Sequence, residues 1–410
     1  MKKNHSLNKE KIKVVLLEGI HPLAQDYFRQ CGYNNVEIIE GALTGEELVA
    51  KIHDAHILGI RSRTKVTPEL LGATQKLIGL GCFCIGTNQV ALQDTALAGI
   101  PVFNAPHSNT RSVAELVIGQ TVMLFRGIFP KSMAAHRAKW QKSAKDSHEI
   151  RGKTMGIVGY GHIGSQVSIL AEAMGMRVLY FDIVSKLPLG NARPTATLEA
   201  LLAESDIVTL HVPEDETTRN MIDEQTLAAM PRGAYLINAS RGSVVDIDAL
   251  ARALQQEHLL GAAVDVFPVE PKSNRDPFHN PLVGMDNVIL SPHIGGSTQE
   301  AQENIAREVA GKLVDFSDTG ATEGAVNFPA VKMPIHADGH RILHVHHNVP
   351  GILRQINMIL AEENINVLGQ YLATNQDIGY VVLDIAKDVS QHALKIMKTI
   401  EGTIRARVLF

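Results

Sequence analysis

The sequence predicts an α/β protein made of two doubly wound parallel-sheet domains followed by a small βαββαβ unit. At residues 154–182 an apolar strand, a glycine-rich turn, an amphipathic helix and a second strand follow one another. Apolar runs and amphipathic stretches alternate before and after that segment, which is typical of βαβ units. With 410 residues the chain exceeds what one core usually serves, so about two or three domains are expected.

The glycine turn at residues 159–164 predicts a Rossmann-type dinucleotide site. Gly159, Gly161 and Gly164 fit the pattern G-x-G-x-x-G, in which the first glycine makes a tight turn and the second lets the backbone approach a pyrophosphate. The third lets the helix pack closely on the strand, and the helix N-terminus favours negative charge. Asp182 ends the next strand, where its carboxylate can bind ribose hydroxyls and repel a 2′-phosphate. We therefore expect NAD rather than NADP, and the alternative is a glycine turn in another kind of α/β protein.

Basic residues follow a predicted strand in the N-terminal part of the chain. Strands are expected at residues 14–17, 36–39, 57–60 and 76–84. A capping box that begins at Thr44 predicts a helix through Ile52. Arg61, Ser62 and Arg63 come directly after the third strand, and strand C-termini face the ligand crevice in open α/β sheets. Two guanidiniums there predict an anion site, and the alternative is a solvated basic turn.

A loop, a helix and a polar segment precede the glycine turn. Ser112 and Glu115 form a second capping-box pattern, which predicts that a long apolar helix starts there. Asn109, in the loop before it, could reach a substrate or simply cap the helix. Residues 131–150 are polar and carry the only tryptophan, Trp140, which we expect to be exposed in a subunit contact.

The alternation continues after the glycine turn and changes near the C-terminus. Strands are expected at 207–211, 233–238, 261–265 and 288–290, and helices at 223–230, 246–255 and 297–315. These strands should join those at 154–158 and 178–182 in one sheet, and residues 316–338 are interpreted as a linker. The last unit should have strands at 342–346, 365–371, 380–385 and 403–409 and helices at 352–363 and 389–399, which is the ferredoxin-like order.

Three residues at the ends of predicted strands suggest chemistry on a hydroxyl group. Oxidation of a secondary alcohol by NAD needs a base for the hydroxyl proton, and His293 titrates nearest neutral pH. Glu270 could orient its ring and favour imidazolium, while Arg241 could hold a substrate carboxylate by paired hydrogen bonds. The alternatives are a packed histidine, a solvated carboxylate and an exposed turn residue. Because the chain has 18 histidines, one histidine alone decides little.

The charge balance and the cysteines narrow the class of partner. The formal net charge is −4 with the two signs interspersed, which indicates small-molecule partners rather than nucleic acid or a membrane surface. Cys31, Cys82 and Cys84 are too few and too irregularly spaced for a disulfide framework or a zinc site, so we expect no metal and a reducing compartment. With a polar N-terminus and no long apolar run, the protein is expected to be cytoplasmic.

Taken together, these motifs resemble the D-isomer-specific 2-hydroxyacid dehydrogenase family. The matching segments are the glycine turn with Asp182, Asn238-Ala-Ser-Arg241-Gly242, Asp265-Val-Phe-Pro-Val-Glu270-Pro271 and Ser291-Pro-His293-Ile-Gly-Gly296. Arg61-Ser62-Arg63, Asn109-Thr-Arg-Ser-Val-Ala-Glu115 and the C-terminal unit narrow the resemblance to one branch. That branch oxidises 3-phospho-D-glycerate to 3-phosphohydroxypyruvate with NAD, which is the first step of L-serine biosynthesis. The resemblance implies the same function for this chain.

The resemblance also implies a role for each site residue. Arg241 would bind the substrate carboxylate, His293 would exchange the proton, and Glu270 would support His293. The positions implied to contact the cofactor are Gly159, Gly161, His162, Ile163, Gly164, Asp182, His211, Ala239, Ser240, Arg241, Asp265, His293, Gly295 and Gly296. Those implied to bind the substrate are Arg61, Ser62, Arg63 and Asn109, and two arginines suit a phosphate-bearing substrate.

The resemblance further implies three domains and a regulatory ligand. A flavodoxin-like, discontinuous substrate-binding domain is expected at residues 1–108 and 297–337, linker included, and the NAD-binding domain at 109–296, with hinge crossings near Asn109 and Gly295–Gly296. Residues 338–410 resemble an ACT regulatory domain, in which L-serine is expected to bind between paired domains through His346, Asn348 and Asn366 of the partner subunit. Feedback inhibition by serine and a homotetramer would follow. The alternative is that these are polar turn residues.

Two positions depart from the family pattern, and two other functions stay open. Ala91 stands where relatives often have an aspartate that caps a helix, and Glu40 stands where some have a basic residue near the phosphate pocket. The alternative functions are reduction of 2-oxoglutarate to 2-hydroxyglutarate, as main or additional activity, and a non-catalytic NAD(H)-sensing interaction protein. Formate dehydrogenases share the fold but carry glutamine in place of the glutamate, so Glu270 argues against them.

Overall fold

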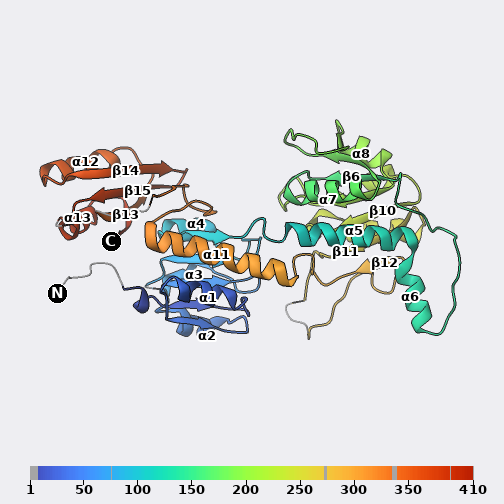
Figure 1. The fold of residues 1–410 in the computed structure, drawn as a ribbon, viewed down its shortest axis with the longest axis horizontal. Coiled ribbons are helices and arrows are strands. Elements are labelled where there is room, and N and C mark those ends of the chain that lie inside the picture. Colours follow the sequence, from blue (N-terminus) through green and yellow to red (C-terminus); the bar gives the residue numbers. More distant parts are fainter. Residues whose placement is uncertain (1–7, 75, 272–274, 335–338, 388, 410) are drawn as a thin grey trace. The chain divides into compact units, whose positions relative to one another are not determined.

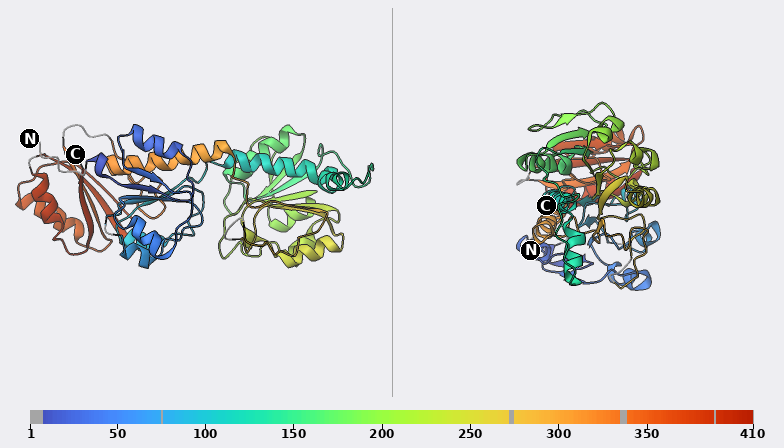
Figure 2. Two further views of the ribbon diagram at one scale, coloured as in Figure 1. Left: turned by 90° about the horizontal axis from the view of Figure 1, so that it is seen from below. Right: turned by 90° about the vertical axis from the view of Figure 1, so that its right-hand side faces the viewer.

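The computed structural model describes residues 8–74, 76–271, 275–334, 339–387 and 389–409, and it divides into two compact units. One unit combines Met1–Ser108 with Gln302–Phe410, and the other is Asn109–Ala301 (Figure 1). Helices cover both faces of the parallel sheet in each unit (Figure 2). The predicted α/β class, with a separate antiparallel sheet at the C-terminus, is therefore confirmed.

The unit of residues 109–301 is built on one seven-stranded sheet in the order β12-β11-β10-β9-β6-β7-β8. All neighbouring strands are parallel. The strands are β6 (Thr154–Val158), β7 (Arg177–Phe181), β8 (Arg193–Pro194), β9 (Ile207–Leu210), β10 (Ala234–Asn238), β11 (Leu259–Val264) and β12 (Val288–Leu290). Because side chains on β6, β9, β10 and β11 are buried throughout or nearly so, these strands read as continuous apolar runs in the sequence.

Helices pack on the two faces of this sheet through separate apolar clusters. On one face lie α5 (Thr110–Arg126) and α7 (His162–Ala173), and on the other α8 (Leu198–Glu204), α9 (Glu224–Ala229) and α10 (Ile247–Gln255). The helix α6 (Ile128–His136) follows α5 after Gly127, which has a left-handed backbone. Part of the polar segment 131–150 is thus helical, since α6 extends to His136. Within the described ranges no single helix is long and apolar enough to cross a membrane, although α5 and α6, bent by 71°, meet the length and composition criteria as a pair.

The predicted start of α5 was wrong by one half-turn. The helix begins at Thr110 after Asn109, so the Ser112–Glu115 pattern lies inside its first turns and forms no capping box. The Ser112 hydroxyl instead lies 2.8 Å from that of Thr298. The capping box predicted at Thr44 does not form either, although Thr44 does precede α2. Both patterns had suitable residues, but the Ser112 hydroxyl contacts Thr298 instead of its own helix, and the Thr44 side chain makes no capping hydrogen bond.

The N-terminal domain of the other unit is a five-stranded parallel sheet in the order β2-β1-β3-β4-β5. Its strands are β1 (Val14–Leu16), β2 (Val36–Ile38), β3 (Ile57–Ile60), β4 (Gly79–Cys82) and β5 (Val102–Asn104). Its helices are α1 (Leu23–Gln30), α2 (Gly45–Ile52), α3 (Pro68–Gly72) and α4 (Leu92–Leu97), after the short 3-10 turn η1 (Lys9–Lys11). The carboxyl ends of β1 and β3 are neighbours, which brings Glu18 and Arg61 to the same sheet edge.

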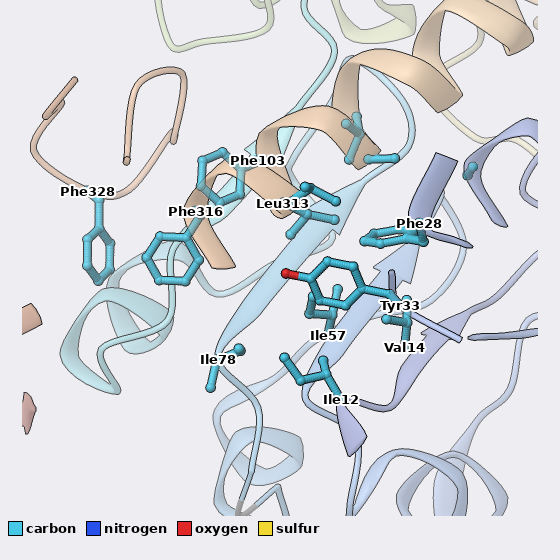
Figure 3. Packing of buried hydrophobic residues seen from close by; sticks show 14 of the residues in the cluster. Ile12, Val14, Phe28, Tyr33, Ile57, Ile78, Phe103, Leu313, Phe316 and Phe328 are labelled. Atoms are coloured by element: carbon cyan, nitrogen blue, oxygen red, sulfur yellow. The ribbon is translucent and has the colours of Figure 1, made fainter. Parts of the chain in front are cut away.

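The long helix α11 (Gln299–Thr319) returns to this N-terminal domain and forms part of its core. Leu313 and Phe316 pack with Phe28 and Phe103, and Phe103 and Phe316 have ring centroids 5.9 Å apart (Figure 3). The prediction ended this helix at Asp315 and placed Phe316 in a linker, which was wrong because Phe316 is a buried core residue. The end of the expected linker, residues 335–338, lies outside the described residues.

The C-terminal residues form a four-stranded antiparallel sheet in the order β14-β15-β13-β16, with the predicted βαββαβ chain order. Its elements are β13 (His340–His347), α12 (Ile352–Glu362), β14 (Val367–Thr374), β15 (Ile378–Ile385), α13 (Ser390–Met397) and β16 (Thr403–Leu409). One face of the sheet packs on α12 and α13. The other joins the core shared with α11, where the Tyr380 hydroxyl donates a 2.7 Å hydrogen bond to the carbonyl of Gly320.

Candidate functional site

The glycine turn after β6 has the geometry that a dinucleotide cradle needs. Gly159 has φ of 91°, and a Cβ there would lie 2.5 Å from the carbonyl oxygen of His211. A Cβ on Gly164 would collide with the carbonyl oxygen of Gly159, so only glycine allows α7 to start this close to β6. A Cβ on Gly161 would meet nothing within 4 Å. The fold therefore requires the first and third glycines, and leaves open space beside the second, where a pyrophosphate would approach.

The residues around this turn fit the rest of the nucleotide. Gly161 caps α7 without a side-chain hydrogen bond, so the first turn, with His162 and Ile163, can offer its N–H groups to phosphate. Asp182 accepts hydrogen bonds from the backbone of Tyr160 at 2.8 Å and of Val184 at 2.9 Å. These two contacts hold the carboxylate beside the glycine turn, and each oxygen keeps a lone pair for a ribose hydroxyl.

His211, directly after β9, forms an uncharged wall beside Gly159. Its Nε2 lies 3.0 Å from the hydroxyl of Thr209, and its enclosed Nδ1 has no partner among the described residues. Burial lowers the pKa of His211 to about 3, so the ring is neutral at physiological pH. His211 thus lies next to the glycine turn, but its low pKa prevents it from exchanging protons near neutral pH.

The turn after β10 is braced from within by Asn238. Its side-chain oxygen Oδ1 accepts hydrogen bonds from the backbone N–H and the hydroxyl of Ser240. Its side-chain nitrogen Nδ2 donates a hydrogen bond to the backbone carbonyl of Arg241 at 3.0 Å. The half-buried Ala239 and Arg241 are carried by this turn. A Cβ on Gly242 would collide with the backbone of Phe267, so glycine lets the turns after β10 and β11 touch. This approach places Arg241 close enough for its charge to lower the pKa of Glu270.

Glu270 and His293 form an ion pair between the loops that follow β11 and β12. The His293 Nδ1 lies 2.9 Å and 3.0 Å from the two carboxylate oxygens, and one of these also accepts a hydrogen bond from the backbone N–H of Phe267. The hydrogen bond and charge of Glu270 raise the pKa of His293, against the effect of burial. Burial acts to raise the pKa of Glu270, but the hydrogen bond and charge of His293 outweigh it and lower that pKa.

The pairing leaves one histidine nitrogen for chemistry. With Nδ1 held by Glu270, Nε2 is the nitrogen from which a proton can be exchanged. His293 also has a left-handed backbone with φ of 53°, which is uncommon for a residue with a side chain. Its N–H donates to the carbonyl of Asp265 at 2.8 Å, so the strained position is fixed by the neighbouring loop.

Asp265 is buried beneath this pair and holds the loop that carries His293. One carboxylate oxygen accepts hydrogen bonds from the Ser291 hydroxyl at 2.6 Å and the Ile294 N–H at 2.9 Å, and the other accepts one from the Gly295 N–H at 2.8 Å. Asp265 therefore lies beside the loop that carries His293, and its predicted contact with the cofactor stays a prediction. The contacts show that it also has a supporting role, which the sequence did not indicate.

Asn109 and Gly296 meet just after the loop that carries His293. A Cβ on Gly296 would collide with the Asn109 amide, so the two predicted hinge positions lie against each other. Asn109 is buried, and its side-chain oxygen Oδ1 has no partner among the described residues. Asn109 is the residue before α5 but makes no side-chain cap, so the capping alternative is not what its side chain does.

The predicted anion-binding loop belongs to the other unit and is built around an unpredicted residue, Glu18. Arg61 is half-buried and Ser62 and Arg63 are exposed, directly after β3. The Glu18 carboxylate accepts hydrogen bonds from the backbone N–H groups of Arg61, Arg63 and Thr64 at 3.2, 3.0 and 2.8 Å. Neither arginine guanidinium donates a hydrogen bond to a described residue, although the Arg63 Nε lies 3.7 Å from the Glu18 carboxylate, so the hydrogen-bond donors of both can bind a ligand.

The three residues predicted to bind an effector lie on the C-terminal sheet and its turns. His346 is buried against Gly379, with Nδ1 bonded to the carbonyl of His347 and Nε2 without a partner among the described residues. Asn348 is exposed and donates to the carbonyl of Asn375 at 2.7 Å. Asn366 is exposed just before the edge strand β14.

Sequence inspection missed the residues that support the site from behind. These are Glu18, Asn238 and Ser291, and in the N-terminal domain also Gln89. Each is polar and lies in or next to a predicted strand end, where an unpartnered polar side chain would be costly. That position was the available signal. Among the described residues no cluster of three or more histidine, cysteine or acidic side chains is placed to hold a metal ion.

Comparisons with known proteins show the family of the chain. Residues 118–295 match the NAD-binding domain of D-isomer-specific 2-hydroxyacid dehydrogenases, and residues 342–405 match an ACT domain like that of the acetohydroxyacid synthase small subunit. The chain is 56% identical to D-3-phosphoglycerate dehydrogenase of Escherichia coli over 99% of both chains, and 55% identical to that of Haemophilus influenzae over 99% of both. A solved D-lactate dehydrogenase of Aquifex aeolicus, complexed with NAD and lactic acid, superposes with a TM-score of 0.67 at 27% identity over 78% of this chain and 100% of that one.

Proposed function

Since this chain belongs to the D-3-phosphoglycerate dehydrogenases of the D-isomer-specific 2-hydroxyacid dehydrogenase family, we propose that it oxidises 3-phospho-D-glycerate to 3-phosphohydroxypyruvate with NAD. The reaction is the first step of L-serine biosynthesis. The observation that carries the proposal is the Glu270–His293 pair at 2.9 Å, close to Arg241 and on the same parallel sheet as the glycine turn. A binding protein that only sensed NAD(H) would have no need of this pair.

The chain's own residues supply the proton chemistry and the substrate grip. Bound NAD would accept the hydride from the carbinol carbon. His293 would take the hydroxyl proton at Nε2, while Glu270 holds Nδ1 and stabilises the imidazolium that results. Arg241 would bind the substrate carboxylate by paired hydrogen bonds and orient the hydroxyl towards His293. In the reverse direction the imidazolium would protonate the carbonyl oxygen.

The phosphate is assigned to Arg61 and Arg63, with Ser62 and Asn109 as further substrate contacts. The guanidiniums are free of hydrogen bonds to described residues and follow the end of a parallel strand, where ligands of such sheets bind. Paired arginines suit a phosphate better than an uncharged substituent.

We propose the three-domain organisation that the motifs indicated: a substrate-binding domain of residues 1–108 and 297–337, an NAD-binding domain of 109–296 and a regulatory domain of 338–410. The boundary between the two compact units after Ser108 and after Ala301 supports the first two. The match of residues 342–405 to an ACT domain supports the third. L-Serine would bind there through His346, Asn348 and Asn366 of the partner subunit, and inhibit turnover.

A homotetramer would follow from pairing of the regulatory domains and a second contact elsewhere. The edge strand β14 exposes Leu368 and Leu372, and Trp140 is 87% exposed, which suits a subunit contact at each place. The three cysteines are free thiols, which supports a reducing, cytoplasmic location. Light scattering at several protein concentrations would measure the oligomeric state.

The proposal is tested by NADH oxidation in the presence of 3-phosphohydroxypyruvate, with 2-oxoglutarate as the competing substrate. We expect the higher kcat/KM for the phosphorylated substrate. Turnover of 2-oxoglutarate alone would support the proposed proton transfer but contradict the proposed substrate. NADH binding without turnover of either substrate would favour the sensing protein.

A further inference from the structure

Glu18 is an internal carboxylate around which the arginine loop is wound. Its side chain is 1% exposed, at the end of β1, and it accepts hydrogen bonds from the backbone N–H groups of Arg61, Arg63 and Thr64. These residues lie more than forty positions away in sequence, on the loop after the neighbouring strand β3. The Glu18 carboxylate thus occupies the concave side of the loop.

The position of Glu18 is costly in two ways, which suggests that the loop conformation matters. A buried carboxylate is tolerated only when hydrogen bonds replace its lost water, as the three N–H groups do here. The backbone of Glu18 is left-handed with φ of 63°, a conformation that costs about 1 kcal/mol or more for a residue with a side chain. Such strain persists where the surrounding structure needs it, often beside a functional site.

The loop is fixed from its other side by Gln89. The Gln89 amide donates to the carbonyl of Arg61 at 2.7 Å and to the carbonyl of Gly86 at 3.2 Å. Arg61 is therefore held at both its N–H, by Glu18, and its carbonyl, by Gln89. The Nε of Arg63 lies 3.7 Å from the Glu18 carboxylate, while its side chain is 50% exposed. The Glu18 carboxylate thus lies near the Nε of Arg63, and the exposed half of this side chain leaves its terminal nitrogens for a ligand.

We propose that Glu18 is a positioning residue for substrate recognition: it fixes the loop of residues 61–64 so that the Arg61 and Arg63 guanidiniums are arranged in advance for the substrate phosphate. This inference rests on the proposed function. The positioning role explains why a negative charge lies next to an anion site. The Glu18 carboxylate binds the backbone N–H groups that could otherwise bind the phosphate themselves. The phosphate is left to the two side chains, whose forked donors bind it in a defined orientation.

The test is Glu18→Gln, an isosteric change in which an amide N–H₂ group replaces one acceptor and faces backbone donors. Steady-state NADH oxidation is measured with 3-phosphohydroxypyruvate and with hydroxypyruvate, the same molecule without its phosphate. The KM for the phosphorylated substrate should rise about tenfold or more, equivalent to about 1.4 kcal/mol of binding. The KM values for hydroxypyruvate and for NADH should change less than about threefold. Asp54→Asn, which removes an exposed carboxylate paired with Lys13 before the start of the same strand β3, is the matched control and should leave all three unchanged.

The outcomes separate this inference from the proposed function. An unchanged KM for 3-phosphohydroxypyruvate, or an equal rise for both substrates, would overturn the positioning role while the wild-type chain still turned over the phosphorylated substrate. A wild-type chain without such turnover would overturn the proposed function, and the inference with it. If Glu18→Gln does not fold, Gln89→Ala takes its place, since it removes the contact to the Arg61 carbonyl from the surface side. A selective rise for the phosphorylated substrate would support the inference, and its absence would refute it.

Discussion

At the scale of single residues, the site depends on a few side chains whose charge is set by their neighbours. His293 is kept protonated to higher pH by Glu270, whereas His211, a short distance along the sheet edge, is kept neutral by burial. The pKa values of two histidines with the same intrinsic chemistry are thus shifted in opposite directions. Only the histidine with the carboxylate partner can act as an acid and a base near neutral pH.

Replacing His293 by alanine should remove proton exchange and little else. Turnover in either direction should fall by about 10²- to 10⁴-fold, because general acid–base catalysis contributes on that order. NADH affinity, measured by fluorescence titration, should stay nearly unchanged, since the cradle lies at another strand end. His53→Ala, at an exposed position in the other unit, serves as the control. A His293→Ala variant with near-normal turnover would exclude the proton-transfer role.

Replacing Glu270 by glutamine should shift the pH dependence in a defined direction. Glu270 raises the pKa of His293, so its loss lowers that pKa. Reduction of the oxo acid needs imidazolium and falls as pH rises through the pKa of His293. The alkaline limb of kcat/KM for reduction should therefore move to lower pH in Glu270→Gln. Glu224→Gln, whose carboxylate pairs with Arg252 on the surface, should leave the limb in place. A limb unmoved in Glu270→Gln would mean that another group titrates.

At the scale of elements, local patterns predicted strands and sheets better than helix ends. The apolar runs at β6, β9, β10 and β11 were recognisable because both faces of a central parallel strand are buried. The end of α11 was missed because Phe316 is held by Phe103 on a distant strand. Likewise nothing local to Glu18 shows that its partners are the N–H groups of the loop after β3. Contacts between distant segments cannot be derived from periodicity.

The helix α4 offers a direct test of a missing cap. Ala91 precedes it with no side-chain hydrogen bond. Ala91→Asp should raise the free energy of unfolding by about 1 kcal/mol, since an N-cap carboxylate bonds the free N–H groups and favours the helix dipole. Thermal and urea unfolding would measure the change. Ala91→Val, which provides no acceptor, is the control, and equal stability of the two variants would show that the cap is unimportant here.

At the scale of the whole molecule, one chain carries the three parts on which the proposed function depends. They are the loop of residues 61–64, the Glu270–His293 pair and the antiparallel sheet at the C-terminus. The order of these parts was predictable, because each carries its own motif or strand pattern in the sequence. The supporting residues Glu18, Asn238 and Asp265 required the fold, since their partners come from other loops. Motifs therefore predicted the groups that we propose to act, and the structure identified the groups that hold them.

The regulatory proposal predicts a selective effect at Asn366. Its side chain is exposed and lies just before β14, so replacing it should not disturb the sheet. Asn366→Ala should raise the L-serine concentration that gives half-inhibition by about tenfold, equivalent to the loss of a hydrogen bond or two to a charged ligand. Inhibition curves with and without the substitution would measure this shift. Gln391→Ala, at an exposed position on α13, is the control, and equal serine sensitivity of all three proteins would place the effector elsewhere.

The most direct measurement of the central claim is to incubate the protein with 3-phospho-D-glycerate and NAD and to follow NADH by absorbance and the keto acid by mass spectrometry. The account predicts that NADH and 3-phosphohydroxypyruvate form in equal amounts, and that His293→Ala slows the formation of both by about 10²- to 10⁴-fold. Formation of NADH from 2-hydroxyglutarate with none from 3-phospho-D-glycerate would contradict it.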